Sequence, residues 1–222
     1  ALVRWQHPER GLVFPDGFIP IAEDYELVIQ LGDWVLREVC RQQQAWRAAG
    51  LVTPPIAVNF SAVQFRERNV VRKVERALAD TGIDPRLLEI ELTESAIMRH
   101  GNETIATLEA LKALGLELAI DDFGTGYSSL QHLRQFPISK IKIDRSFVAD
   151  LLHDAQAASI VQAIVNLGHS MQLRVLAEGV ESREQLERLR GWGCDAFQGY
   201  FHAAAMAADA FAGMLGATTQ RD

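Results

Sequence analysis

Residues 116–124 read LELAIDDFG, a short apolar stretch that ends in two adjacent carboxylates, Asp121 and Asp122. Four further apolar stretches end in an amide, a carboxylate or an amine: PPIAVNF at 54–60, LLEIELTES at 87–95, ISKIKIDR at 138–145 and LRVLAEGV at 173–180. Their polar ends are Asn59, Glu91, Lys142 and Glu178, spaced at intervals that each suit one strand-helix unit. Polar and charged groups at the carboxyl ends of successive strands are typical of α/β barrel enzymes.

Amphipathic stretches alternate with these strands. Apolar spacing predicts helices at residues 24–49, 61–79, 94–114, 128–136, 156–171, 182–192 and 207–215. Two shorter strands are expected at residues 2–5 and 196–200. Strands that alternate with helices indicate a parallel sheet with crossover helices, and this number of units favours a closed barrel. We expect a single domain over residues 1–222.

The two faces of each predicted strand differ in polarity. Successive side chains of a strand point to opposite faces, so Ile90 and Leu92 share one face while Glu89 and Glu91 share the other. The helix-covered outer face of a barrel must be apolar, which predicts that the polar strand ends point inward and converge on one mouth. A lone acid after a strand is most often a helix cap or a turn residue. Five strand ends of matching parity are poorly explained as five independent caps.

The predicted mouth carries four carboxylates: Glu91, Asp121, Asp122 and Glu178. At ~4 Å and intermediate dielectric each pair would repel by about 4 kcal/mol, a cost that divalent cations would remove. The ligands are oxygens and the six histidines show no metal-site spacing, which favours Mg²⁺, Mn²⁺ or Ca²⁺ over zinc. Asp121 would bridge two ions, an arrangement that suits in-line phosphoryl displacement. Lys142 would then orient the attacking water, and Glu178 would act as general base.

The composition excludes several function classes. A formal net charge of −7 without a Lys/Arg block argues against nucleic-acid binding, so we expect no DNA partner. No apolar run reaches membrane-spanning length and no signal peptide is visible, so we expect no membrane contact by this domain. Cys40 and Cys194 form no CxxC motif, which favours a reducing, cytoplasmic compartment. Because the chain starts at Ala1 without a methionine, we expect it to be part of a longer protein.

The chain resembles the EAL domain, the bacterial phosphodiesterase module that hydrolyses cyclic di-GMP to linear pGpG. The matching segments are ALVRWQHPERG, FIPIAED, VNFSAVQ, ELTES, IDDFGTGYSSL, KIKIDRSFV, LAEGVES and GCDAFQGY. They span almost the whole chain, and DDFGTGYSSL and AEGVES are highly specific. The resemblance implies an α/β fold, a TIM-like (β/α)8 barrel whose first strand, antiparallel in the family, is missing from this chain. It also implies Mg²⁺ or Mn²⁺ at a two-ion site.

The resemblance assigns roles to individual residues. It implies that the metal ligands are Asn59, Glu91, Asp121, Asp122 and Glu178. Lys142 would contact the catalytic water, Gln198 would lie in the site, and Arg4 would hold a substrate phosphate, a task that suits a guanidinium. Glu94 would brace the loop after Asp122, which the family associates with dimerisation and with the coupling of upstream signals to metal binding. This loop begins with Phe123, Gly124, Thr125, Gly126 and Tyr127.

The resemblance also implies partners and leaves alternatives. The expected partners are cyclic di-GMP, a second copy in a homodimer, and an upstream sensory or GGDEF-type domain in the parent chain. The family's signature glutamate would directly precede Ala1 and is not in this sequence. We favour a parent protein that carries it, because the other ligands are intact; the alternative is a receptor that binds cyclic di-GMP without cutting it. A remoter alternative is an enolase-type barrel enzyme with Lys142 as base.

The segment around Gly124 and Gly126 lacks the GxxxxGK pattern of a nucleotide P-loop.

Overall fold

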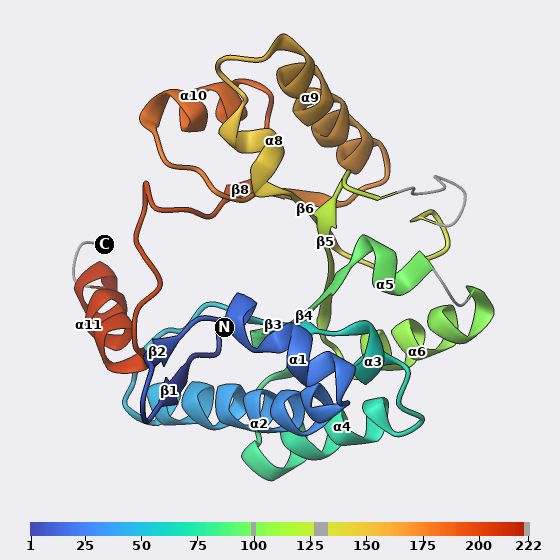
Figure 1. Ribbon diagram of the computed structural model, residues 1–222, viewed down its shortest axis with the longest axis vertical. Coiled ribbons are helices and arrows are strands. Elements are labelled where there is room, and N and C mark those ends of the chain that lie inside the picture. Colours follow the sequence, from blue (N-terminus) through green and yellow to red (C-terminus); the bar gives the residue numbers. More distant parts are fainter. Residues whose placement is uncertain (99–100, 127–132, 220–222) are drawn as a thin grey trace. The chain divides into compact units, whose positions relative to one another are not determined.

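The computed structural model describes residues 1–98, 101–126 and 133–219, and divides into two compact units (Figure 1). The first unit comprises Ala1–Ile90, Ala113–Leu116 and Ala205–Asp222; the second comprises Glu91–Lys112 and Glu117–Ala204. The larger sheet has the strand order β3-β4-β5-β6-β7-β8, which is also the order of these strands along the chain. This order confirms the predicted alternation of strands and helices. No helix in the described ranges is both long and apolar enough to span a membrane.

The first unit combines a small hairpin with helices and one complete strand of the larger sheet. In the hairpin β1 pairs with β2 antiparallel, with Gln6 opposite Leu12. The predicted strand at 2–5 therefore lies three residues further along the chain, at Trp5–His7. The elements of this unit are β1 (Trp5–His7), β2 (Gly11–Val13), η1 (Pro15–Gly17), α1 (Ile19–Asp24), α2 (Leu27–Ala48), β3 (Ile56–Phe60), α3 (Ala62–Phe65), α4 (Val70–Thr81), η2 (Pro85–Leu87), the start of β4 (Leu88–Thr93) and α11 (Ala208–Thr219).

Helix α2 supplies much of the core of the first unit. Its buried apolar side chains recur at helical spacing, from Val28 through Leu36 and Val39 to Trp46. The ring of Trp46 packs against that of Phe211 in α11, with 5.4 Å between the ring centroids. Leu27 and Trp34, which are also apolar, stay more than half exposed, so only part of the apolar pattern of α2 is buried.

The single helix predicted at residues 61–79 is wrong, because the chain forms two helices there. Ser61 and Gln64 form a capping box that starts α3, and α3 ends after one turn at Phe65. The next N–H groups donate in tight turns, Glu67 to the Gln64 carbonyl and Val70 to the Glu67 carbonyl, before α4 begins. The ammonium of Lys73 holds this turn by contacting the Glu67 carboxylate at 2.6 Å.

The second unit is a parallel αβ layer. Strands β5, β6, β7 and β8 pair in parallel, with Ile120 opposite Ile141 and Ile141 opposite Val175. Figure 1 shows α8, α9 and α10 together on one side of β6 and β8. The elements of this unit are the end of β4, α5 (Glu94–Met98), α6 (Gly101–Ala113), β5 (Glu117–Phe123), β6 (Lys140–Ile143), α8 (Arg145–Ala149), α9 (Ala155–Ser170), β7 (Arg174–Ala177), α10 (Arg183–Gly191) and β8 (Ala196–Phe197).

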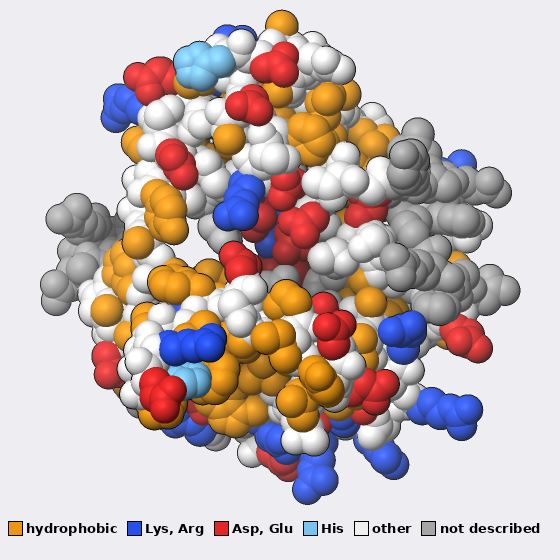
Figure 2. All heavy atoms as spheres, viewed as in Figure 1, with side chains coloured by type: hydrophobic (Ala, Val, Ile, Leu, Met, Phe, Trp, Pro, Cys, Tyr) orange, Lys and Arg blue, Asp and Glu red, His pale blue; other side chains and the backbone are white. Residues whose placement is uncertain are grey.

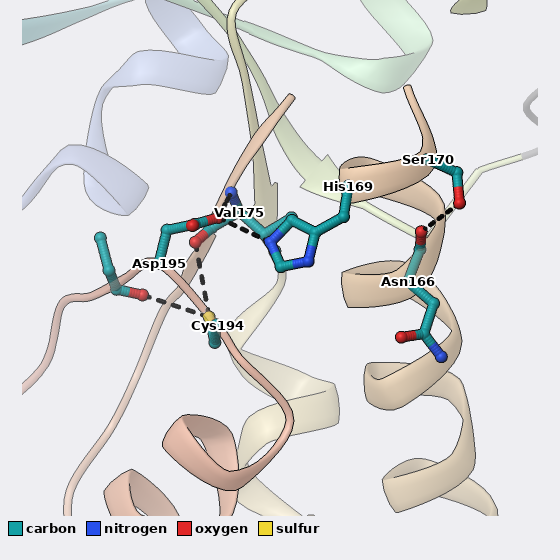
Figure 3. A network of polar contacts seen from close by, with 7 residues as sticks. Asn166, His169, Ser170, Val175, Cys194 and Asp195 are labelled. Atoms are coloured by element: carbon teal, nitrogen blue, oxygen red, sulfur yellow. Dashed lines mark hydrogen bonds and ion pairs between the residues drawn. The ribbon is translucent and has the colours of Figure 1, made fainter. Parts of the chain in front are cut away.

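The start of the two-residue strand β8 is fixed to β7 by a polar network (Figure 3). The carboxylate of Asp195 accepts the Val175 N–H at 2.7 Å and lies 3.0 Å from Nε2 of His169 at the end of α9. The Cys194 thiol donates to the carbonyls of Val175 and Ala196 at 3.4 and 3.3 Å. Burial raises the pKa of Cys194 to about 11, so it stays a thiol at neutral pH. The Cys194 side chain therefore helps to hold β8 against β7.

Candidate metal centre and active site

The predicted polar strand ends of the second unit meet around one ammonium group, that of Lys142. Its Nζ lies 2.7 Å from Glu91 Oε1, 2.9 Å from Asp121 Oδ1 and 2.7 Å from Glu178 Oε1. The residue is only 3% exposed, so these contacts are largely shielded from water. Acidic side chains gather near the middle of the view in Figure 2. We call Glu91, Asp121, Asp122, Lys142 and Glu178 the carboxylate cluster.

Strand pairing brings these side chains to the same level. Glu91 lies in β4, Asp121 in β5 and Lys142 in β6, while Glu178 follows β7 directly. The N–H of Glu178 donates to the carbonyl of Ile143 at 3.1 Å, which continues the β6–β7 pairing past the end of β7. The neighbouring residues Ile143 and Ala177 are completely buried, as expected for side chains that alternate between two faces. Carboxyl ends of parallel strands are where active sites of this architecture lie.

An irregularity in β5 places Asp122 beside Asp121. The register between β5 and β6 shifts between Ile120 and Phe123, and Asp122 has a φ of 54°. Aspartate tolerates this left-handed conformation better than most residues, and here the Asp122 N–H donates to Asp121 Oδ1 at 3.1 Å. As a result Asp121, Asp122 and Glu178 each offer one carboxylate oxygen, and these oxygens lie within 4.8 Å of one another.

The pKa values of the cluster show the cost of gathering acids. Burial raises the pKa of Asp122 to about 6, with the charge of Asp121 acting in the same direction. Burial also raises the pKa of Glu178, against the opposing charge of Lys142. Burial tends to lower the pKa of Lys142, but the charges of Glu91, Asp121 and Glu178 outweigh it and hold the pKa well above its usual range. The lysine is therefore fully charged at neutral pH.

The donor set fits a hard divalent cation. Three carboxylates contact the single positive charge of Lys142, and the carboxylate of Asp122 lies near those of Asp121 and Glu178, so the cluster keeps an excess of negative charge. Its donors are carboxylate oxygens, the ligands that Mg²⁺, Mn²⁺ and Ca²⁺ prefer. A cation bound at Asp121, Asp122 and Glu178 would remove the repulsion that raises the pKa of Asp122.

Asp144 is a further acid at this site that the sequence analysis did not include. Its carboxylate interacts with that of Asp122 and caps α8 by accepting the Ser146 N–H at 2.9 Å. Burial raises the pKa of Asp144, but the hydrogen bonds from Ser146 and Asp122 outweigh it and lower the pKa overall. The signal that could have found Asp144 was parity, because it shares a strand face with Lys142.

Glu94 contacts the start of the loop that follows Asp122. Its buried carboxylate accepts the Gly124 N–H at 2.9 Å, and a Cβ added at Gly126 would lie 2.7 Å from its Oε1. The Thr125 hydroxyl donates to the carbonyl of Asp122 at 2.8 Å. Phe123 is buried, whereas Tyr127 and the predicted helix at 128–136 fall at least partly outside the described residues. Glu94 thus holds the loop at the point where it leaves β5.

The other predicted site residues are distributed over both units. In the second unit Gln198 donates its N–H to the Ala177 carbonyl at 2.8 Å, and its carbonyl accepts the Val180 N–H at 3.0 Å. Its backbone therefore lies next to the strand end that carries Glu178. Asn59 and Arg4 belong to the first unit, where the Arg4 guanidinium lies 4.7 Å from the centre of the Phe14 ring. Their roles in the site stay predictions.

Comparison with known proteins identifies the family. The model of the EAL domain matches residues 1–205. The chain is 46% identical over 209 residues to the bifunctional diguanylate cyclase/cyclic di-GMP phosphodiesterase MucR of Pseudomonas aeruginosa, covering 94% of this chain and 30% of MucR. It is 44% identical over 200 residues to the cyclic di-GMP phosphodiesterase NbdA of the same species, covering 90% of this chain and 26% of NbdA. The chain thus spans less than a third of the length of these relatives.

A solved structure supports the same assignment. The structure named "PaMucR Phosphodiesterase, c-di-GMP complex" aligns with a TM-score of 0.92 and 45% sequence identity, over 95% of this chain and 85% of that chain. This likeness confirms the predicted α/β fold of the (β/α)8 barrel type. The sequence match, the fold and the carboxylate cluster agree: the chain belongs to the EAL domain family.

Proposed function

We propose that this chain hydrolyses cyclic di-GMP to linear pGpG with Mg²⁺ or Mn²⁺ at the carboxylate cluster. The observation that carries the proposal is the meeting of Glu91, Asp121 and Glu178 on Lys142, with Asp122 beside them. The cluster occurs in a chain that is 46% identical to a protein named as a cyclic di-GMP phosphodiesterase. We propose the same activity for the whole protein to which this chain belongs.

The proposed ligands of the cations are Asn59, Glu91, Asp121, Asp122 and Glu178. When bound, the divalent cations supply charge neutralisation at the phosphate and make the attacking water more acidic. The chain's own part is to hold the carboxylates in place, which the bulge at Asp122 and the backbone hydrogen bond of Glu178 support. Asp121, whose carboxylate lies near those of both Asp122 and Glu178, is the proposed bridging ligand.

In the proposed reaction a water oxygen attacks one phosphorus of the cyclic dinucleotide and the P–O3′ bond breaks. One proton of the water passes to the Glu178 carboxylate, which later releases it to solvent, and the released 3′ oxygen takes up a proton from solvent water to become the 3′ hydroxyl of pGpG. Glu178 is the proposed base because its carboxylate lies in the cluster, 2.7 Å from the ammonium of Lys142. Lys142 is the proposed residue that orients the water, since its ammonium lies among the proposed ligands of the cations.

Further roles follow from the family. Arg4 is proposed to hold a phosphate of the substrate, and Gln198 to lie in the substrate site. Glu94 and the loop that starts at Phe123 are proposed to couple dimerisation and upstream signals to cation binding, a role that the contact between Glu94 and Gly124 supports. We further propose a single catalytic domain over residues 1–222, a homodimer, an upstream sensory or GGDEF-type domain, and a cytoplasmic location.

Incubation of the purified full-length protein with cyclic di-GMP and Mg²⁺ or Mn²⁺ tests the proposal. Chromatography should show conversion to pGpG, and excess EDTA should stop it. If cyclic di-GMP binds but no pGpG is released, the chain is a receptor and not an enzyme. Absence of cyclic di-GMP binding would reject the substrate altogether.

A further inference from the structure

A buried glutamine, Gln185, connects two of the segments that carry the carboxylate cluster. It is 7% exposed and lies in the first turn of α10. Its side-chain oxygen accepts the N–H of Glu181 at 2.7 Å and the N–H of Ser182 at 3.0 Å. Its side-chain nitrogen donates to the carbonyl of Val148 at 3.1 Å. The amide is thus bonded at both ends to backbone groups far apart in the sequence.

One of the two bonded segments begins at a residue of the cluster, and the other begins three residues after one. Glu181 and Ser182 end the short loop that starts at Glu178, whose carboxylate contacts Lys142. Val148 belongs to α8, which begins at Arg145, three residues after Lys142. Gln185 therefore fixes the loop after β7 to the helix after β6, the two segments that follow Glu178 and Lys142 in the chain.

The packing around the loop leaves Glu178 little freedom. Gly179 has a φ of 70°, and a Cβ added there would lie 2.7 Å from the Cβ of Arg145 at the start of α8. Beyond it, the Val180 N–H donates to the carbonyl of Gln198 at 3.0 Å. The Glu178 side chain is therefore positioned by close contacts immediately after it, and Gln185 closes the far end of the same loop.

We propose that Gln185 is a positioning residue for the reaction: through the loop at 178–182 it holds the Glu178 carboxylate in its place against Lys142. The inference rests on the proposed function, because the reaction and the cations give this position its purpose. Loss of the hydrogen bonds from Gln185 to the loop and to α8 lets the Glu178 carboxylate shift. A displacement of about 1 Å at a reacting group costs on the order of 100-fold in rate.

Two substitutions separate this role from a general contribution to folding. Gln185→Met keeps the length of the side chain and removes all three hydrogen bonds. Gln185→Asn keeps the amide but is one methylene too short to reach both segments. The matched controls are Gln43→Met and Gln43→Asn, because Gln43 is also buried and its amide donates to the carbonyls of Pro54 and Leu87, which precede strands β3 and β4.

The decisive measurement is Mn²⁺ binding followed by electron paramagnetic resonance in the full-length protein, together with kcat and KM for cyclic di-GMP. We expect both Gln185 variants to bind Mn²⁺ about tenfold more weakly and to lose about 10- to 100-fold in kcat, with KM changed less than about threefold. The Gln43 variants should unfold at lower temperature but keep Mn²⁺ affinity and kcat within about twofold.

Folded Gln185 variants with wild-type Mn²⁺ affinity and kcat would overturn the inference, as would an equal loss in the Gln43 variants. If Gln185→Met does not fold, the same two measurements on Gln185→Asn, which keeps the amide, decide the question. The proposed function fails differently: the wild-type protein then makes no pGpG, while the comparison of Mn²⁺ affinities still decides the role of Gln185.

Discussion

Replacement of Lys142 by methionine should destabilise the metal-free protein strongly and in a pH-dependent manner. The side chain is buried, and its ammonium contacts three carboxylates at 2.7–2.9 Å. Removal of one partner from a buried ionic group typically costs about 3–5 kcal/mol, because the charges left behind are uncompensated. For a chain of this size each kcal/mol lowers Tm by about 2–4 °C, so Tm should fall by roughly 6–20 °C at pH 8 in EDTA.

The pH dependence follows from the direction of the pKa shifts. In the wild type the pKa of Lys142 is raised, since the three carboxylates outweigh burial, so the stability that it adds is fully present below its ordinary pKa of about 10.4. In Lys142→Met, Asp122 and Glu178, whose pKa values burial already raises in the wild type, lose the opposing charge of Lys142, so their pKa values rise further. The folded variant then binds more protons than the unfolded chain, and its stability falls as the pH rises. The loss of stability of Lys142→Met relative to the wild type should therefore be much smaller at pH 5 than at pH 8.

Thermal unfolding followed by circular dichroism, in EDTA at pH 5 and pH 8, measures both effects. Lys73→Met is the control, because Lys73 also contacts two carboxylates, Asp33 and Glu67, but its side chain is 24% exposed. Such partly exposed pairs contribute about 0–1 kcal/mol. Millimolar Mg²⁺ should restore part of the stability of Lys142→Met by binding the folded state. A Tm like that of the wild type at pH 8, or a loss of equal size at both pH values, would refute the reasoning.

Three further predictions concern single acids. Asp121→Asn should lower kcat by about 1000-fold or more while the circular dichroism spectrum stays native; normal turnover would exclude a bridging role. Because burial and Asp121 raise the pKa of Asp122 to about 6, the metal-free wild type should lose stability as the pH rises from about 4 to 6, and Asp122→Asn should lose less in urea titrations. Burial raises the pKa of Asp195, but the hydrogen bonds from the Val175 N–H and from His169 outweigh it and lower the pKa overall, so the carboxylate stabilises the fold at neutral pH and loses this effect in acid. Asp195→Asn should therefore cost about 1 kcal/mol of unfolding free energy at pH 7 and almost nothing at pH 3 in the same titrations.

The alternation of side chains along regular strands predicted the part of the site that lies in or directly after the strands. Glu91, Asp121 and Lys142 lie on the polar faces of their strands, and Glu178 directly follows β7, so a pattern of period two was enough to place them together. Asp144 obeys the same parity but was not chosen as a candidate, and the structure shows that its carboxylate also caps α8.

Other features depend on three-dimensional contacts that no local pattern contains. The left-handed backbone at Asp122 arises where the register of β5 shifts against β6, which depends on strand pairing. The sequence placed Lys142 among these carboxylates and predicted that it would orient water, but the three direct contacts of its ammonium depend on how the strands pair. The interruption between α3 and α4 is accompanied by an ion pair between Lys73 and Glu67, which no local pattern predicts.

Two strand-to-helix turns use the same four-residue cap. Ser61 and Gln64 form a capping box directly after β3, the strand of Asn59, and Ser182 and Gln185 form one shortly after Glu178. Because each cap fixes where the helix starts, an inserted residue between strand and serine would displace either the helix or the strand end. Natural variation in chain length should therefore be absent from these two turns and concentrate in connections that lead from a helix into the next strand.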